Sequence, residues 1–152
     1  MNARLTRFCS AVLLVLSTTL MAADGDPYAE LAAYKYGDSR KALTAIEAST
    51  RGASADQLKQ IEAKLIAVLQ APNATPDVKG WICVLLRQVG SEASIAPVAA
   101  LLADKDISVR ACIALQSLPG PKADEALREA LPKVPAELQA GVLQTIGARR
   151  DA

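Results

Sequence analysis

The fold is decided by a stretch that occurs twice, as Trp81-Ile82-Cys83-Val84-Leu85-Leu86-Arg87-Gln88-Val89-Gly90 and as Arg110-Ala111-Cys112-Ile113-Ala114-Leu115-Gln116-Ser117-Leu118-Pro119. The two copies are offset by 29 residues, which places Cys83 on Cys112 and Leu86 on Leu115. A third copy starts at residue 135 with an offset of 28, where Leu115 meets Leu143. A fixed period of about 20 to 50 residues is typical of stacked repeats. The sequence therefore predicts an array of similar units.

Apolar residues within each copy recur at helical spacing. In the second unit they stand at positions i, i+4, i+7, i+8 and i+11: Val78, Ile82, Leu85, Leu86 and Val89. This pattern predicts an amphipathic helix that ends at Gly90, followed by a shorter helix with Pro97 near its start and Val98 and Leu102 facing inward. No segment alternates between polar and apolar residues as a strand does. We predict an all-α fold, an α-α solenoid in which about three and a half helix pairs form a right-handed stack.

An earlier helix pair precedes these copies, over residues 39–50 and 55–70. Ser54 and Gln57 form a capping-box signature at the start of the second helix. Its expected core residues are Leu58, Ile61, Leu65, Val68 and Leu69, and its expected solvent-facing residues are Gln57, Lys59, Gln60, Glu62 and Lys64. Residues 24–37 are expected to form an N-terminal cap with a short helix over 27–36. The repeat domain then spans 38–152, with units at 38–72, 75–103 and 106–132.

The last unit, over residues 135–150, is incomplete, because it contains the first helix of a pair alone. That helix carries an apolar stripe that we expect to be packed: Leu138, Val142, Leu143 and Ile146. The sequence therefore predicts an open end of the stack at this helix.

The first 23 residues have the three parts of a secretory signal peptide. Arg4 and Arg7 precede an apolar stretch over residues 8–20, and small residues follow it. At 13 residues the stretch is shorter than the roughly 20 that a membrane-spanning helix needs, so a permanent anchor is the weaker alternative. We predict cleavage after Ala22 or Ala23 and export to the periplasm or the extracellular space. Cleavage removes two of the 17 cations and none of the 16 acids, which leaves a net charge of −1.

Composition excludes several classes of function. The chain has no histidine, so Ser-His and Cys-His nucleophiles and His-ligated zinc are impossible. Ser-Lys pairs, carboxylate pairs and bound cofactors remain open on composition alone. The 16 acidic residues are scattered, which argues against a carboxylate pair for hydrolysis, and two thiols without histidine, a third cysteine or nearby carboxylates make a poor metal site. Aromatic residues make up 3% of the chain and its net charge is +1, so it lacks the stacking platforms and positive field of nucleic-acid binders. We therefore expect no catalytic, cofactor-binding or metal-binding residues.

Several distinctive residues have structural explanations. Cys83 and Cys112 occupy equivalent positions in neighbouring helices, whose axes lie about 8 to 10 Å apart, whereas a disulfide needs Cα atoms within roughly 7 Å. A disulfide remains an alternative, but we expect two free thiols in the core. Trp81 is expected to contact the core or a neighbouring unit, and the Arg149-Arg150 pair is expected to be solvated.

The stretch Asp106-Ile107-Ser108-Val109-Arg110-Ala111-Cys112-Ile113-Ala114-Leu115-Gln116-Ser117-Leu118 resembles the first helix of short HEAT-like repeats of the phycobilisome-lyase type. Residues 95–104 resemble the second helix of such a unit. The mature chain is also similar to N-terminal regions of exported bacterial HEAT-repeat proteins, in Tyr28, Tyr34, Gly37-Asp38-Ser39-Arg40 and Ile46-Glu47. The resemblance implies an α-solenoid that serves as a scaffold or protein-binding surface, with no catalytic residues to carry over.

The second copy departs from the family pattern at one place. It has Gly80-Trp81 where the third copy has Val109-Arg110, so an Asp-to-Arg ladder between units is at most partial. Arg110 would pair with Asp106, one turn earlier on its own helix, or with Asp77 in the adjacent unit.

These observations predict a non-catalytic exported scaffold that binds a protein partner. The expected contact residues lie on the second helices (Gln57, Gln60, Lys64, Asp124, Arg128) or at the open C-terminal end (Leu138, Val142), where end-to-end self-association is a further possibility. An alternative is the leading module of a larger exported enzyme. A weaker alternative is a protein related to bilin lyases, against which the signal peptide and the absence of histidine argue.

Overall fold

The computed structural model describes residues 26–150, and this part of the chain is all-α, as predicted, with no strand. Its elements are α1 (Pro27–Leu31), α2 (Lys41–Thr50), α3 (Ala55–Leu69), α4 (Pro76–Val89), η1 (Glu92–Ser94), α5 (Ile95–Ala99), α6 (Ser108–Ser117), α7 (Lys122–Ala130) and α8 (Ala136–Arg150). The predicted signal peptide and its cleavage site lie outside the described residues.

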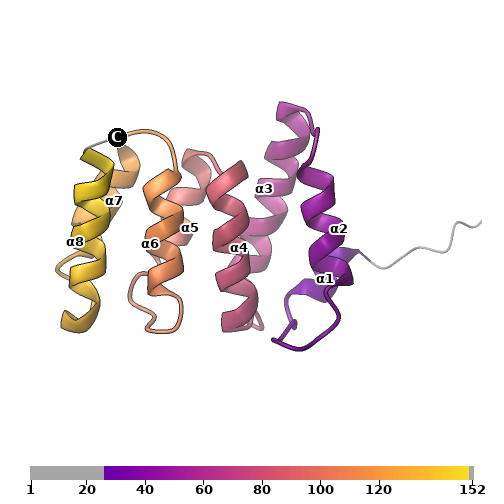
Figure 1. Ribbon diagram of the computed structural model, residues 1–152, viewed down its shortest axis with the longest axis horizontal. Helices are drawn as coiled ribbons and strands as arrows, with labels where there is room; N and C mark the ends of the chain where they lie inside the picture. Colours follow the sequence, from indigo (N-terminus) through magenta and orange to yellow (C-terminus); the bar gives the residue numbers. More distant parts are fainter. Residues whose placement is uncertain (1–25, 151–152) are drawn as a thin grey trace, which may run out of the picture.

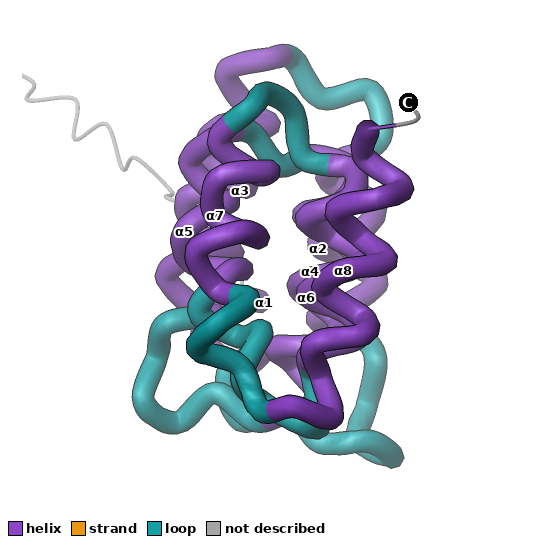
Figure 2. Tube along the Cα trace, turned by 90° about the vertical axis from the view of Figure 1, so that its left-hand side faces the viewer, coloured by secondary structure: helices purple, strands orange, loops and turns teal. Residues whose placement is uncertain are grey.

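The helices form two layers. Helices α2, α4, α6 and α8 stand side by side in the first layer, and α3, α5 and α7 stand in the second (Figure 1). Seen from the end of the stack, the two layers face each other across the core (Figure 2). The chain alternates between the layers, so helices of one layer all run in the same direction.

Local sequence signals explain where α3 and α4 begin. The Ser54 hydroxyl accepts the Gln57 N–H at 3.3 Å and the Gln57 side chain accepts the Ser54 N–H at 2.8 Å, which confirms the predicted capping box of α3. Thr75 caps α4 in the same way through the Val78 N–H. Helix α1 is shorter than predicted, because it ends at Leu31 instead of continuing to residue 36. The following loop, residues 32–40, uses its backbone groups for contacts with α4.

The predicted apolar stripe of α4 forms part of the core, where Val78, Ile82 and Leu86 have no exposed surface. The prediction that the apolar stripe of α8 is packed is partly wrong. Val142 is fully buried, but Leu143 is 53% exposed. Leu143 lies on the face of α8 that points away from α6, and no other described helix covers it.

Glu62 of α3 corrects another prediction, since it is 4% exposed instead of facing solvent. Its carboxylate accepts the Ser91 N–H at 2.6 Å and the Ser94 hydroxyl at 2.6 Å, and it also accepts the Ser91 hydroxyl. These bonds satisfy polar groups at the start of η1, where a helix has no internal partners for its first N–H groups. The carboxylate therefore joins α3 to the turn between the two helices of the next pair.

Arg149 of α8 has a corresponding role at the next turn, so the expectation of a solvated side chain is wrong. The side chain is 10% exposed and its Nε donates to Asp124 Oδ1 at 2.8 Å. Its terminal nitrogens donate at 2.7 to 3.0 Å to the carbonyl groups of Leu115, Gln116, Leu118 and Gly120. One guanidinium thereby satisfies the C-terminal carbonyls of α6 and fixes α8 against the turn to α7.

Replacing Arg149 should destabilise the protein more than replacing an exposed arginine does. We expect Arg149→Met to lower the free energy of unfolding by about 3 kcal/mol, because it leaves Asp124 and several carbonyls without their charged donor. Arg149→Lys should recover part of this loss, since one ammonium replaces few of the bonds. The matched control Arg128→Met, on exposed α7 surface, should change stability by less than about 0.5 kcal/mol. Urea unfolding measures all three, and equal effects at positions 149 and 128 would contradict the assigned role.

Candidate functional site

The loop over residues 32–40 is fastened to the start of α4. The Thr75 N–H donates to the Ala32 carbonyl at 3.2 Å, and the Thr75 hydroxyl donates to the Tyr34 carbonyl. The Tyr36 N–H donates to Asp77 Oδ2 at 3.0 Å. Gly37, with φ of 102°, supplies the left-handed backbone with which the loop turns toward α2. These contacts place two tyrosines beside the N-terminal turn of α4.

Trp81 faces this loop from the second turn of α4. It is half-buried against the core, and its indole Nε1–H donates to Glu47 Oε1 of α2 at 3.1 Å. The predicted contact with a neighbouring unit is therefore present. Gly80 precedes it, and a β-carbon there would collide with the Arg110 side chain from α6. The absence of a side chain at Gly80 thus lets Arg110 lie across α4 toward the tryptophan.

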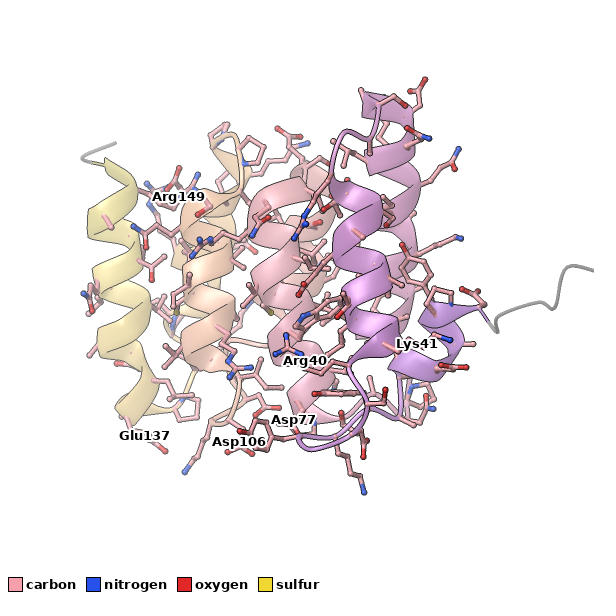
Figure 3. The ribbon with its side chains drawn as sticks, turned by 45° about the vertical axis from the view of Figure 1, so that its right-hand side comes forward. Arg40, Lys41, Asp77, Asp106, Glu137 and Arg149 are labelled. Atoms are coloured by element: carbon pink, nitrogen blue, oxygen red, sulfur yellow. The ribbon has the colours of Figure 1, made fainter. Side chains whose placement is uncertain are left out.

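Together these groups form an open cleft of about 490 Å³, which we call the aromatic cleft. It is lined by Tyr34, Tyr36, Gly37, Asp38, Arg40, Leu43, Asp77, Trp81 and Arg110. Three of the four aromatic residues in the described part of the chain therefore lie in one cleft. Figure 3 shows Arg40 and Asp77 at the same end of the first layer, opposite the end that holds Arg149.

The charged groups of the aromatic cleft differ in whether they have partners. Asp38 accepts the Lys35 N–H at 2.7 Å, and Asp77 accepts the Tyr36 N–H. Arg40 and Arg110 have neither a hydrogen bond nor an ion pair to their guanidinium groups among the described residues. The proposed pairing of Arg110 with Asp106 or Asp77 is therefore not formed. The acidic groups serve the local fold, whereas both guanidinium groups are available to a ligand.

The partner surface predicted from the sequence is divided among separate places. Gln57, Gln60 and Lys64 line a hollow of about 280 Å³ beside α1, where Lys64 Nζ lies 4.9 Å from the centre of the Tyr28 ring. Asp124 and Arg128 lie on α7, and the Asp124 carboxylate is bound to Arg149. The structure therefore does not bring the α3 and α7 residues into one site.

The residues predicted at the C-terminal end also have different environments. Val142 is fully buried, so its assignment to a partner surface is wrong. Leu138 is half-buried and lines a groove of about 430 Å³ between α6 and α8. The same groove exposes Val109 and Ile113 of α6, and its other lining is mostly small or polar. This is a second open surface of the first layer.

Neither of the two cysteines in the described part of the chain is suited to chemistry. Cys83 and Cys112 are free and buried, in agreement with the expected thiols. Burial raises the pKa of Cys83 to about 12, against the opposing effect of the Arg110 charge. Burial also raises the pKa of Cys112, which hydrogen bonds with Thr145 and Ser108 oppose. Both groups therefore stay protonated at neutral pH, and the reactive species of a cysteine is the thiolate.

Over residues 26–150, no three His, Cys, Asp or Glu side chains gather as a metal site would require. In the same part of the chain, no helix has the length and apolarity to cross a membrane. Comparison with protein-family models, curated proteins and solved structures finds no match to this chain. The aromatic cleft must therefore be interpreted from its own geometry.

Sequence reasoning missed the aromatic cleft because its parts come from distant segments. The clearest hint of the cleft in the sequence was the departure from the repeat at Gly80-Trp81, which the sequence analysis interpreted only as a poorer match to the family pattern. A second signal was the pair Tyr34 and Tyr36 beside the conformationally free Gly37. Neither signal shows that residues 32–40 bind the start of α4.

The raised thiol pKa values predict low reactivity. At pH 8 we expect Ellman's reagent to label Cys83 in the folded protein at least about 100-fold more slowly than a free thiol, and to label two thiols in the denatured chain that lacks residues 1–23. Rapid labelling of Cys83 in the folded protein would contradict its burial.

The same pKa also predicts a dependence of stability on pH. The stabilisation from the protonated Cys83 is complete below about pH 9 and is lost as the pH rises toward 12, because the unfolded thiol ionises first. Wild type should therefore lose stability relative to Cys83→Ala over this interval, which urea unfolding at each pH measures. A constant difference between the two proteins would contradict the raised pKa.

Proposed function

We propose that this protein is a non-catalytic exported scaffold, an α-α solenoid of HEAT-like helix pairs, that binds another protein through the aromatic cleft. The observation that carries the proposal is the convergence of three aromatic rings and two unpaired guanidinium groups on one open cleft. The 29-residue period and the alternation of helices between two layers support the repeat architecture. The composition of residues 1–23 supports export.

The chemistry of the aromatic cleft favours recognition of a protein. Tyr, Trp and Arg are the residues in which interface binding energy is concentrated. Tyr36 is 91% exposed, although hydrogen bonds hold the backbone of the loop in which it lies. Such exposure is unusual for an aromatic side chain. A partner that covers this ring would bury a large apolar area without any loss of backbone freedom.

The same chemistry argues against catalysis. The carboxylates of Asp38 and Asp77 accept local backbone hydrogen bonds, so both serve the fold of the cleft. The lining contains no serine, cysteine or lysine that could act as a nucleophile.

Site-specific cross-linking in the exporting cell tests the proposal. A photoreactive phenylalanine analogue would replace Tyr36 in one variant and Arg128, on exposed α7, in a matched variant. We expect the protein in the exported fraction to begin at Ala23 or Asp24, and position 36 to cross-link one discrete protein that position 128 does not. Adding Trp81→Ala to the first variant should remove that product, because the cleft loses one of its three aromatic rings.

Two results would contradict this function. A protein that remains in the cytoplasm with its first 23 residues intact would contradict export. Absence of a cross-linked protein at position 36, with a discrete product at position 128, would place the partner on the second-layer surface instead.

A second candidate function follows from the exposed face of α8. Leu143 is exposed, whereas Leu115, its counterpart in the sequence repeat, is fully buried. This difference favours a further helix pair stacked on α8, as in the leading module of a larger exported enzyme. Reading the coding frame beyond residue 152 decides the matter, since a stop codon there would remove this candidate.

A further inference from the structure

The aromatic cleft holds two guanidinium groups without an acceptor, beside two carboxylates that already have donors. Arg40 enters from the residue before α2, and Arg110 enters from α6 over Gly80. Both guanidinium groups lack a partner among the described residues, while the two carboxylates of the cleft accept backbone N–H groups. The groups of the cleft that remain free to bind a ligand are therefore hydrogen-bond donors, which suit an anionic group.

We propose that the aromatic cleft binds an extended protein segment in which a glutamate or aspartate lies next to proline. This proposal rests on the proposed function and specifies the partner of the same site. The carboxylate pairs with Arg110 and Arg40, and the neighbouring proline rings pack on Trp81 and Tyr36.

The acidic residue follows from the geometry of arginine. A guanidinium binds a carboxylate through two parallel N–H···O bonds, which are shorter and stronger than neutral hydrogen bonds. Arg110 already crosses α4 without any local acceptor, so a ligand carboxylate would supply the partner that Asp77 and Asp106 do not. Asp38 and Asp77 keep their charges beside the guanidinium groups, so the preference for a carboxylate rests on the free hydrogen-bond donors of the arginines and not on the net charge of the cleft.

The proline follows from the arrangement of the rings. Trp81 is half-buried with its indole N–H bound to Glu47, so it presents a ring and no free donor to a ligand. Tyr36 stands almost fully exposed on the loop over residues 32–40, so aromatic residues from this loop and from α4 line the same cleft. Aromatic-lined grooves bind polyproline II segments, whose preset conformation lowers the entropy lost on binding.

An acidic protein segment fits the mature chain better than a polyanion such as nucleic acid. After removal of residues 1–23 the chain has a net charge of −1, which provides no long-range attraction for a phosphate backbone. Two arginines beside two aspartates form a local donor site, suited to one carboxylate in a peptide.

The single tryptophan of the chain reports directly on the cleft. Three synthetic peptides serve as probes: Ac-Pro-Pro-Glu-Pro-Pro-NH2 and its glutamine and lysine counterparts. Titration followed by Trp81 fluorescence, and by the indole N–H resonance in NMR spectra, gives the three affinities. We expect the glutamate peptide to bind about fivefold more tightly than the glutamine peptide, and the lysine peptide to bind most weakly.

Variants test whether the selectivity comes from the guanidinium groups. Arg110→Gln should make the glutamate and glutamine peptides equal in affinity, and Arg110→Lys should keep part of the difference. The matched control Arg128→Gln should keep the full difference. Circular dichroism spectra establish that the variants are folded, which is expected because the Arg110 side chain is exposed.

Equal affinities for the three peptides, a preference for the lysine peptide, or no binding at millimolar concentration would each overturn the proposed ligand. These results are separate from the cross-linking experiment. If position 36 cross-links a protein while the peptides show no acidic preference, the proposed function stands and the acidic proline-containing segment is wrong. If the peptides bind as expected and position 36 cross-links nothing, the proposed function fails and the ligand specificity of the cleft stands.

Discussion

The backbone groups at helix ends impose the constraint on which this structure depends, because they have no partners within their own helices. In a protein of short helices such ends are numerous, and here neighbouring segments satisfy them. The Ala32 carbonyl accepts the Thr75 N–H at the start of α4, Glu62 accepts the Ser91 N–H at the start of η1, and Arg149 binds the carbonyls that end α6. Each contact joins segments that are distant in sequence, so the turns fix the packing of the layers.

The aromatic cleft is a consequence of this constraint together with a local departure from the repeat. Fastening residues 32–40 to α4 carries Tyr36 to the first layer, where it lines the same cleft as Trp81 and Arg110. Gly80 and Trp81 stand where the third unit has Val109 and Arg110, and both differences serve the cleft. The glycine provides space for an arginine, and the tryptophan fills the space between α2 and α4. Regular positions of the repeat build the core, and irregular ones build the candidate site.

The sequence predicted what depends on local spacing and missed what depends on packing. Helical periodicity placed Ile82 and Leu86 in the core, and the Ser54 capping box placed the start of α3. Periodicity also put Glu62 on the solvent side and Arg149 in solvent, because it carries no information about a turn in another unit. Leu143 was expected to be buried by analogy with its repeat counterpart, although burial depends on a neighbouring helix. The aromatic cleft required the fold of residues 32–40, which no periodic pattern describes.

Native-state hydrogen exchange tests most directly whether contacts between segments organise the fold. The backbone N–H groups of Tyr36, Thr75 and Ser91 lie outside the bodies of the helices, yet each donates to a distant segment. We predict that all three exchange at least about 100-fold more slowly than in an unstructured chain, together with the amides of α4. Exchange of these three amides at the rates of an unstructured chain, while α4 remains protected, would contradict the account.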